Sequence, residues 1–375
     1  MAHHSHRILV LDGGMGTTLE AQGYDVSSQL WGLEVVFKNP SILSEIHKKY
    51  IAAGADIIET ATYQLTLANI CDHLRCSEEE ARLALHRGLL LAREAVHDEA
   101  VKRAVRSGIA LSFGPYGSTL QPGQEYGGVY PPPFGPSITS NFFPAASRAE
   151  EREQVVQALA QYHLVKLQAF GDLLKQVEWI AFETIPVLHE VYAIRRAMSL
   201  LRLELRINQN AESRTWWDDI KYWITSPYPQ GFHPQLSESG KHTDAQQVMQ
   251  ALFDDSETSV PDGVGINCTN PSYLATLTKQ MTLHLPASIN KKPWFVLYPD
   301  GGQIYDTTAR NWTIAPQSPA NAEEWAASVG SLAIEMADAK RDGNYVWEGV
   351  IVGGCCKSSF VEITALRKFV DRHCH

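Results

Sequence analysis

The sequence predicts an α/β fold, a single (β/α)8 barrel of the TIM type, on three observations. Eight short runs of apolar, β-branched and aromatic residues recur along the 375-residue chain, and helical patterns separate them. Strands that alternate with helices form a parallel sheet, and eight such units close into a barrel. Acidic, glycine and cysteine residues follow the runs, which is where this fold places its active site, at the C-terminal ends of the strands.

Each predicted strand has four to six residues and ends at, or just before, a polar or glycine residue. The predicted strands are residues 7–11, 56–59, 108–113, 179–183, 221–225, 263–267, 294–298 and 349–352. Between them, apolar residues recur at helical spacing. The predicted helices are residues 41–53, 77–105, 148–176, 188–201, 244–253, 273–284, 320–341 and 359–373.

Two segments interrupt the alternation. Residues 121–147 contain PPPFGP and little periodicity, so they are expected to form a long loop or insertion, either a lid over the site or a disordered segment. Residues 225–242 form a second loop on the same rim. A domain boundary inside residues 121–147 would split the barrel, so we expect residues 1–375 to form one domain.

Composition restricts the class of protein. With 32 basic and 42 acidic residues the net charge is −10, and no run of about five or more basic residues is present, which argues against a nucleic-acid partner. No apolar stretch reaches the roughly 18 residues of a membrane span, so no membrane partner is expected. Six cysteines in 375 residues form no disulfide framework, which is typical of a reducing compartment, and we expect a cytoplasmic protein.

Three cysteines are the most informative residues. Cys268 follows the sixth predicted strand, and Cys355 and Cys356 follow the eighth. In a closed barrel these two strand ends lie close enough for their loops to share one ion, and three thiolates with one open position are typical of a catalytic zinc site. The alternative is that some of the three are buried core thiols. A bond between Cys355 and Cys356 is not expected, because adjacent residues bridge only with strained geometry.

Acidic residues lie at other strand ends. Asp12 precedes Gly13 and Gly14, whose backbone N–H groups suit a zwitterionic ligand, although a plain strand-to-helix turn is the alternative. Glu183 ends the fourth strand in FETIP, and a buried carboxylate there needs a cationic partner or a proton. Glu59 at the end of the second strand has the same two interpretations, functional or structural, and the sequence does not favour either.

Together these motifs resemble the homocysteine S-methyltransferase family. The resemblance extends from position 11 to position 356, and GINC followed by GGCC is its most specific part. The segments that carry it are LDGGMGTTLE, LWGLEVVFKNPSILSEIHKKYIAAGADIIETATYQ, SFGPYGSTLQPGQEYGG, FETIP, GINCTNP, YPDGGQIYD and VGGCC. Members more often have YPNSGE where this chain has YPDGGQ, and residues 130–147 look like an insertion.

The resemblance implies roles for individual residues. Cys268, Cys355 and Cys356 match the thiolates that bind one Zn²⁺ per chain. The implied homocysteine-binding residues are Asp12, Gly13, Gly14, Thr60, Glu183 and Asn267, in which the two acids bind the amino group and the glycines lie near the carboxylate. The implied donor-side residues are Trp31, Tyr63, Tyr116 and Glu125. No catalytic residue beyond the zinc site is expected.

The implied reaction is zinc-dependent methyl transfer from a sulfonium donor, S-methylmethionine or S-adenosylmethionine, to the thiol of L-homocysteine, which gives methionine. The partners would be these small molecules. Betaine as the donor is an alternative, and so is a non-catalytic zinc-binding barrel. A barrel lyase or aldolase would place a lysine or a phosphate-binding loop at the strand ends, where this chain has GGCC.

Overall fold

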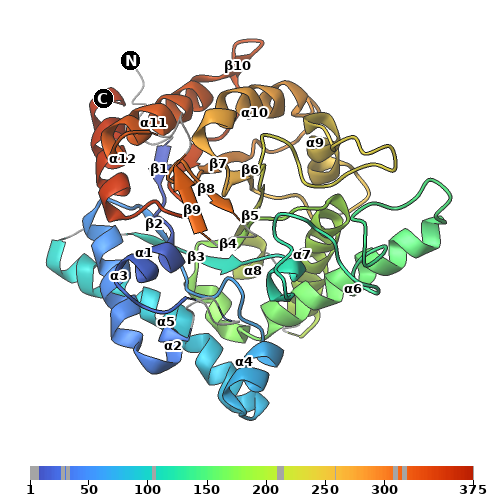
Figure 1. Ribbon diagram of the computed structural model, residues 1–375, viewed down its shortest axis with the longest axis horizontal. Coiled ribbons are helices and arrows are strands. Elements are labelled where there is room, and N and C mark those ends of the chain that lie inside the picture. The colour runs from blue at the N-terminus through green and yellow to red at the C-terminus, as the bar shows by residue number, and fades with distance from the viewer. Residues whose placement is uncertain are drawn as a thin grey trace.

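The computed structural model describes residues 8–26, 30, 34–103, 107–208, 215–257, 259–306, 311–314 and 319–374, and its centre is a barrel of eight parallel strands (Figure 1). The strand order is β1-β12-β7-β6-β5-β4-β3-β2. A parallel bridge between Leu11 and Ile57 joins the two ends of the sheet, and the Asp56 N–H donates to the Val10 carbonyl at 2.7 Å. The predicted fold class is therefore confirmed.

All eight predicted runs are barrel strands, with ends that differ from the prediction by no more than one residue. The strands are β1 (Ile8–Val10), β2 (Ile57–Glu59), β3 (Gly108–Phe113), β4 (Trp179–Phe182), β5 (Lys221–Ser226), β6 (Gly263–Asn267), β7 (Trp294–Tyr298) and β12 (Val350–Val352). Their agreement with the sequence pattern follows from burial, since strands covered by helices on one side and filled on the other are apolar throughout.

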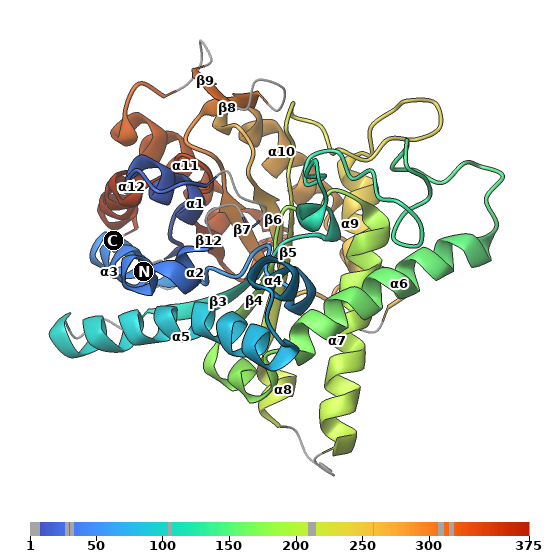
Figure 2. The same ribbon diagram turned by 60° about the horizontal axis from the view of Figure 1, so that its bottom comes forward.

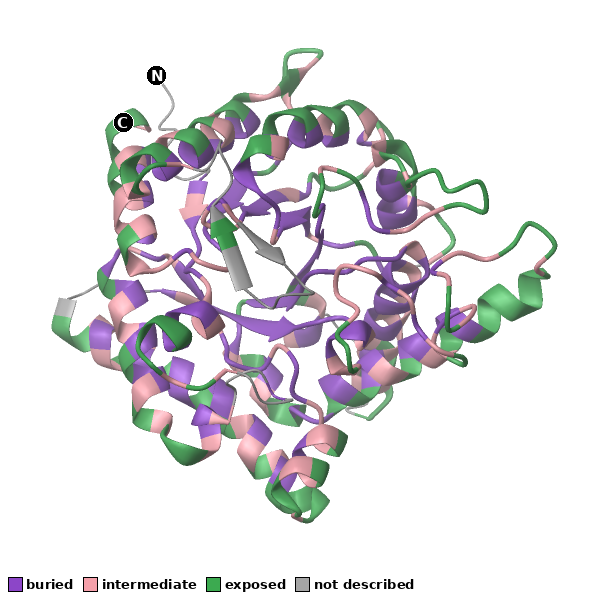
Figure 3. Cartoon of the chain, viewed as in Figure 1, coloured by how far each residue is buried: buried purple, intermediate pink, exposed green. Residues whose placement is uncertain are grey.

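Helices surround the barrel, with their buried faces turned toward it (Figure 3). The predicted helices correspond to α3 (Pro40–Ala52), α5 (Glu78–Arg103), α6 (Ala149–Gln168), α7 (Leu188–Asn208), α9 (Ala245–Phe253), α10 (Pro271–His284), α11 (Ala322–Asp338) and α12 (Phe360–His373). The prediction of one helix over residues 148–176 was wrong at its end. The α-helix α6 ends at Gln168, and Gly171, with φ 50°, begins the separate 3-10 helix η3 (Gly171–Gln176).

Several short elements were not predicted, because each is too short to show a period. They are α1 (Met15–Ala21), α2 (Val35–Lys38), α4 (Leu67–Leu74), η2 (Tyr116–Thr119), α8 (Trp216–Asp219) and the hairpins β8 (Gln303–Asp306) with β9 (Asn311–Ile314) and β10 (Lys340–Arg341) with β11 (Asn344–Tyr345). The β8–β9 hairpin follows β7 and rises above the C-terminal ends of the strands (Figure 2).

The barrel interior is a packed core with a polar top. Trp179, Trp223, Val296 and Ile351 are among the apolar side chains of this inner cluster. Gly265 on β6 allows a close approach, since a Cβ there would lie 1.8 Å from the Val296 carbonyl oxygen. Above this layer the inward residues become polar, and the site described below is built on them.

The two long rim loops are held together. Asn141 in the first loop is buried, and its Nδ2 donates to the carbonyls of Gly127 (2.7 Å) and Pro234 (3.0 Å). Its Oδ1 accepts from the Leu236 N–H at 2.9 Å. Residues 121–147 therefore form a structured loop bound to the second rim loop, which corrects the disordered alternative. The prediction of a lid stays a prediction.

Candidate metal and substrate site

The three predicted cysteines lie together at the C-terminal end of the barrel. Their sulfur atoms are all within 4.8 Å of one another, and this is the metal-type cluster found in the described part of the chain. Cys268 follows β6 directly, and Cys355 and Cys356 follow β12 by way of Gly353 and Gly354. The strands β6 and β12 are separated only by β7 in the barrel, so their C-terminal ends lie close together. This arrangement brings Cys268 and Cys355, 87 positions apart in the sequence, into one cluster, as the sequence predicts.

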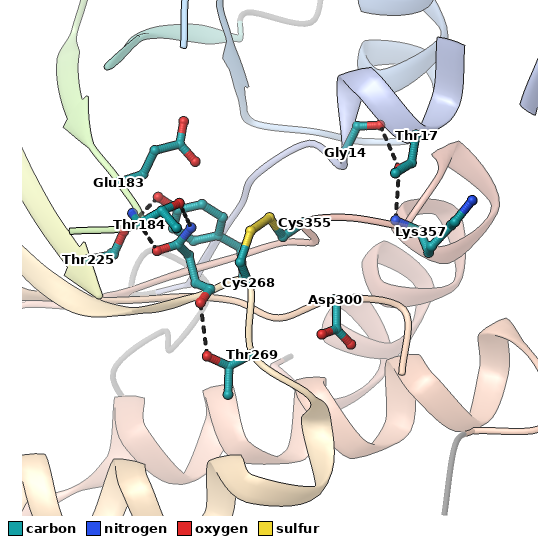
Figure 4. The surroundings of a disulfide bond; sticks show 12 residues. Gly14, Thr17, Glu183, Thr184, Thr225, Cys268, Thr269, Asp300, Cys355 and Lys357 are labelled. Atoms are coloured by element: carbon teal, nitrogen blue, oxygen red, sulfur yellow. Dashed lines mark hydrogen bonds between the residues drawn. A yellow bond between two sulfur atoms is a disulfide. The ribbon is translucent and has the colours of Figure 1, made fainter. Parts of the chain in front are cut away.

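Two of the three sulfurs form a bond that the sequence did not indicate. Cys268 and Cys355 are joined as a disulfide, and Cys356 is a free thiol (Figure 4). Thiols that converge on one point are close enough to react with each other when an oxidant is present. The disulfide joins cysteines from two different strand ends and not the adjacent residues Cys355 and Cys356. In this oxidised state the chain cannot offer three thiolates to a metal.

Cys356 has an environment that calls for a cation. Burial, together with the nearby carboxylates of Asp300 and Glu183, raises the pKa of its thiol to about 12. A thiol in these surroundings stays protonated unless a positive charge binds it. The three sulfurs therefore fit a soft divalent metal such as zinc, both in ligand type and in number.

Two of the predicted acids are buried beside the cysteine cluster. Asp12 is 2% exposed and Glu183 6% exposed. Asp12 Oδ2 accepts from the Glu59 N–H at 3.0 Å, whereas its Oδ1 is buried without a hydrogen-bond partner among the described residues. Burial raises the pKa of Asp12, and the nearby Glu183 raises it further.

Glu183 is anchored by neutral groups. Its Oε1 accepts from Ser112 Oγ at 2.5 Å. Ser112 on β3 pairs with Ala181 on β4, two residues before Glu183, so both side chains face the interior. Burial raises the pKa of Glu183 to about 7, and hydrogen bonds from Ser112 and Tyr298 and the charge of Lys166 oppose that shift.

Lys166 on α6 is a buried cation behind this wall of the barrel. It is 4% exposed, and its Nζ donates to the Gly114 carbonyl at 3.4 Å and lies 5.0 Å from the centre of the Phe113 ring. Burial lowers the pKa of Lys166 to about 7, while Glu190 and Glu183 oppose the shift. Lys166 is therefore a partial counter-charge for Glu183 at the C-terminal end of the barrel.

Other predicted substrate residues already have partners within the protein. The Gly14 N–H donates to the Ser358 carbonyl at 2.9 Å, so of the two glycines only Gly13 remains a candidate donor to a ligand. The Thr60 hydroxyl lies 2.6 Å from that of Thr62 and accepts from the Ser112 N–H. These contacts connect β2 to β3, which is a structural role that the sequence did not indicate.

Asn267 supports an unusual backbone conformation. Its side chain accepts from the Thr184 N–H at 2.8 Å and donates to the Thr184 hydroxyl at 2.7 Å. Thr184, immediately after Glu183, has φ 62°, and Cys268 and Lys357 also have positive φ. β-Branched residues rarely adopt this region, and such conformations gather at functional sites. Asn267 thus positions the turn that carries Glu183.

The predicted donor-side residues divide into three cases. Tyr63 lies near both Glu125 and Glu183: burial raises the pKa of its hydroxyl, and the charges of these two carboxylates raise it further. The ring of Tyr116 stacks on Phe134 with 4.1 Å between centroids and packs among further aromatics, so it belongs to a cluster behind the rim. Trp31 lies outside the described residues.

Sequence reasoning missed several members of the site. Ser112, Tyr298 and Lys166 carry no local signal, because they contact the acids only through strand register and helix packing. Asp300 did have a signal, since YPDGGQ departs from the pattern of the family. Its Oδ1 accepts from the Gly302 N–H at 2.8 Å, and burial raises its pKa to about 7.

Comparisons with known proteins match one family along almost the whole chain. A family model described as Homocysteine S-methyltransferase matches residues 9–370. The chain is 26% identical to Homocysteine S-methyltransferase 3 of Zea mays, over 98% of this chain and 91% of that protein. It is 27% identical to Homocysteine S-methyltransferase YbgG of Bacillus subtilis, over 94% and 91%.

Solved structures show the same fold. The metallated form of the homocysteine methyltransferase MmuM of Escherichia coli superposes with a TM-score of 0.61 at 24% identity, covering 97% of this chain and 96% of that one. The oxidized form of the same protein has a TM-score of 0.64 at 22% identity, covering 96% and 95%. Among the helices described for this chain, none combines the length and apolar character that crossing a bilayer requires.

Proposed function

The chain belongs to the homocysteine S-methyltransferase family, and on that premise we propose that it transfers a methyl group from a sulfonium donor to the thiol of L-homocysteine, giving methionine. The donor would be S-methylmethionine or S-adenosylmethionine. The observation that carries the proposal is the convergence of three cysteine sulfurs beside buried acids at the mouth of the barrel.

Zinc fits the three sulfurs. In the reduced chain Cys268, Cys355 and Cys356 would hold one Zn²⁺. A zinc ion bound by three thiolates keeps an open position and lowers the pKa of a thiol that binds there, from about 8.5 to below neutral. The acids around the cluster favour a positive charge and support this occupant.

The acids would bind the amino group of homocysteine. An ammonium group between Asp12 and Glu183 would compensate two carboxylates that otherwise lie buried without sufficient positive charge. The Gly13 N–H would meet the substrate carboxylate. These contacts would direct the thiol toward the cysteine cluster, and holding the two reactants in line would supply much of the acceleration.

The chemistry requires no proton donor to the leaving group. The sulfur of homocysteine would attack the methyl carbon, and the electron pair of the breaking C–S bond would return to the donor sulfur, which leaves as a neutral thioether. Tyr63 and Tyr126 both lie close enough to Glu125 and Glu183 for the carboxylate charges to act on their hydroxyls, and an acidic, aromatic wall favours a cationic donor. Trp31 and Tyr116 remain predictions for this side.

A donor assay tests the proposal. Reduced, zinc-loaded protein would be incubated with homocysteine and S-methylmethionine, S-adenosylmethionine or betaine in turn, and methionine would be measured. We expect turnover with at least one sulfonium and about one zinc per chain. Turnover with betaine and with neither sulfonium would identify betaine as the methyl donor and refute the sulfonium donor proposed here. Tight zinc binding without any methionine would identify a non-catalytic zinc-binding barrel.

The same proposal makes the chain one homocysteine-binding domain over residues 1–375, with small molecules as partners. The cytoplasm is the compartment that suits it, since a site of three thiols requires a reducing environment.

Ser112→Ala is expected to move the pH dependence of homocysteine binding to higher pH. Ionised Glu183 binds an ammonium group, so affinity should rise as pH rises through about 7. The Ser112 hydrogen bond favours the ionised form of Glu183, so its loss should raise the pKa of Glu183. The rise in homocysteine affinity with pH should then occur about one pH unit higher. The measurement is the Kd for homocysteine between pH 5.5 and 8.5, chosen to span about one and a half units either side of that pKa.

Ser118→Ala is the matched control, because Ser118 is a buried serine whose hydroxyl bonds to the Pro115 carbonyl and not to an acid. Titration of the homocysteine thiol contributes equally to both variants, so the difference between them isolates Glu183. The same pH dependence of the homocysteine Kd in the two variants would contradict this role of Ser112.

A further inference from the structure

A buried carboxylate behind the rim of the barrel accepts three hydrogen bonds from three different parts of the chain. Glu190, in the first turn of α7, is 0% exposed. Its Oε1 accepts from the Tyr116 N–H at 2.7 Å and from His163 Nε2 at 3.0 Å, and its Oε2 accepts from the Tyr130 hydroxyl at 2.7 Å. Tyr116 begins η2, His163 belongs to α6, and Tyr130 lies in the first rim loop. One side chain therefore joins α7 to α6 and to two points of the segment that follows β3.

Glu190 is ionised in these surroundings. Burial alone would raise its pKa, but the contacts with His163, Tyr116 and Tyr130 outweigh burial and lower it. Burial lowers the pKa of His163, so its imidazole is neutral near pH 7, and its Nε2 carries the hydrogen because a carboxylate can only accept. Hydrogen bonds to an ionised acceptor are about twice as strong as those between neutral groups. The three groups are therefore held firmly at the Glu190 carboxylate.

Two of these hydrogen bonds enclose a short segment of the rim. Residues 116–130 begin and end at the Glu190 carboxylate, so they form a closed loop, here named the clamped loop, with Glu190 at its neck. Inside the loop the Gln124 N–H donates to the Gly117 carbonyl at 2.9 Å, and the Gly128 N–H donates to the Gln124 carbonyl at 2.8 Å. These bonds make a turn from Gln124 to Gly128 and fix it to the part of the loop that Glu190 holds.

The turn of the clamped loop carries two residues of the donor side. Glu125 and Tyr126 lie inside it. Burial raises the pKa of the Tyr126 hydroxyl, and the charges of Cys356 and Glu125 raise it further, so Tyr126 lies close to the cysteine cluster. The clamped loop thus extends from the buried Glu190 behind the rim to the place where the methyl group would be transferred.

We infer that Glu190 is a positioning residue for the methyl donor: by holding both ends of the clamped loop, it places Glu125 and Tyr126 beside a cationic sulfonium. This inference rests on the proposed function, because it takes a sulfonium as the occupant. Homocysteine would be bound by Asp12 and Glu183, which follow β1 and β4 and lie outside the clamped loop. Loosening the loop should therefore weaken binding of the donor and leave binding of homocysteine nearly unchanged.

Tyr130→Phe is the most direct test, because it removes one hydroxyl from the Glu190 carboxylate and changes no charge. Two quantities would be measured on reduced, zinc-loaded protein: amide hydrogen exchange of the clamped loop, and the KM for S-methylmethionine, S-adenosylmethionine and homocysteine. Loss of a hydrogen bond to a charged group should speed exchange in the loop about tenfold. The KM for the sulfonium that gives turnover should rise about tenfold, whereas the KM for homocysteine should change by less than about twofold.

A second variant and a matched control accompany it. Glu190→Gln keeps the size of the side chain but replaces one acceptor oxygen by an NH2 group, so it should show the same difference between donor and homocysteine. Tyr192→Phe is the control, since the Tyr192 hydroxyl also donates to a carboxylate, Asp254 Oδ2 at 3.0 Å, but lies on α7 outside the clamped loop. It should retain the wild-type exchange rates and KM values.

Two results would overturn the inference. One is wild-type exchange of the clamped loop in Tyr130→Phe and Glu190→Gln. The other is faster exchange without a larger rise in KM for the sulfonium than for homocysteine, which is what a purely structural role would give. Failure of the proposed function would look different: the wild type would form no methionine from any donor. The role toward the donor would then fall with it, and the exchange rates would still show whether Glu190 holds the loop.

Discussion

Replacing Cys268 or Cys356 by serine is expected to remove both the zinc and the methyl transfer while the barrel remains folded. A serine hydroxyl is a poor ligand for zinc at neutral pH, and without the metal the thiol of homocysteine stays largely protonated. A loss of about 4 kcal/mol in transition-state stabilisation corresponds to about a thousandfold in rate. The measurements are zinc per chain, methionine formation and far-ultraviolet circular dichroism.

The controls use the cysteines outside the cluster. Cys71→Ser and Cys374→Ser should keep zinc and activity, since both residues are free thiols elsewhere in the fold. Oxidised wild-type protein, in which Cys268 and Cys355 are joined, should behave like the variants until a thiol reductant restores it. Full activity in a zinc-free Cys268, Cys355 and Cys356 triple mutant would refute the metal site.

Glu183→Gln should weaken homocysteine binding and stabilise the protein at the same time. Loss of a charged partner for the ammonium group should raise KM for homocysteine about 10- to 100-fold, with a smaller change in kcat. The second effect has its origin in the free protein. There the pKa of Glu183 is about 7, so the folded state holds a proton that the unfolded chain has already released.

The sign of the stability effect follows from this difference. Between about pH 4.5 and 7 the folded protein binds more protons than the unfolded chain, so the stability of the wild type falls as pH rises through this window. Glutamine does not titrate, and the variant should be more stable above pH 7 by on the order of 3 kcal/mol. Thermal unfolding of both proteins at pH 5 and pH 8 measures the difference. The first pH lies about half a unit above the low end of this window, and the second lies about one unit above its high end.

A variant that is destabilised at both pH values, or that binds homocysteine normally, would contradict the role given to Glu183. Glu178→Gln serves as the control, because Glu178 precedes β4 at the far end of the same strand, where it accepts a hydrogen bond from the Ile109 N–H. The combination of higher stability and weaker binding is characteristic of a binding residue, since a purely structural acid would lose stability when replaced.

The sequence predicted the frame of the site well, for an identifiable reason. The strands of the barrel are apolar on both sides, and each ends at, or within two residues of, a glycine or a polar residue. Strand positions and the rim that they share can therefore be predicted from local pattern. The cysteines and Glu183 were found because they lie at such strand ends. The β8–β9 hairpin was missed because four-residue strands leave no period to detect.

By itself, the sequence determined the barrel, the rim on which the chemistry lies and the residues that could hold a metal. Only the tertiary structure decided which groups those residues meet. Ser112 reaches Glu183 through the register of β3 and β4, and Glu59 reaches Asp12 where β2 and β1 close the ring. Burial, which raises the pKa values of these acids, likewise depends on packing between distant segments, and no local pattern encodes it.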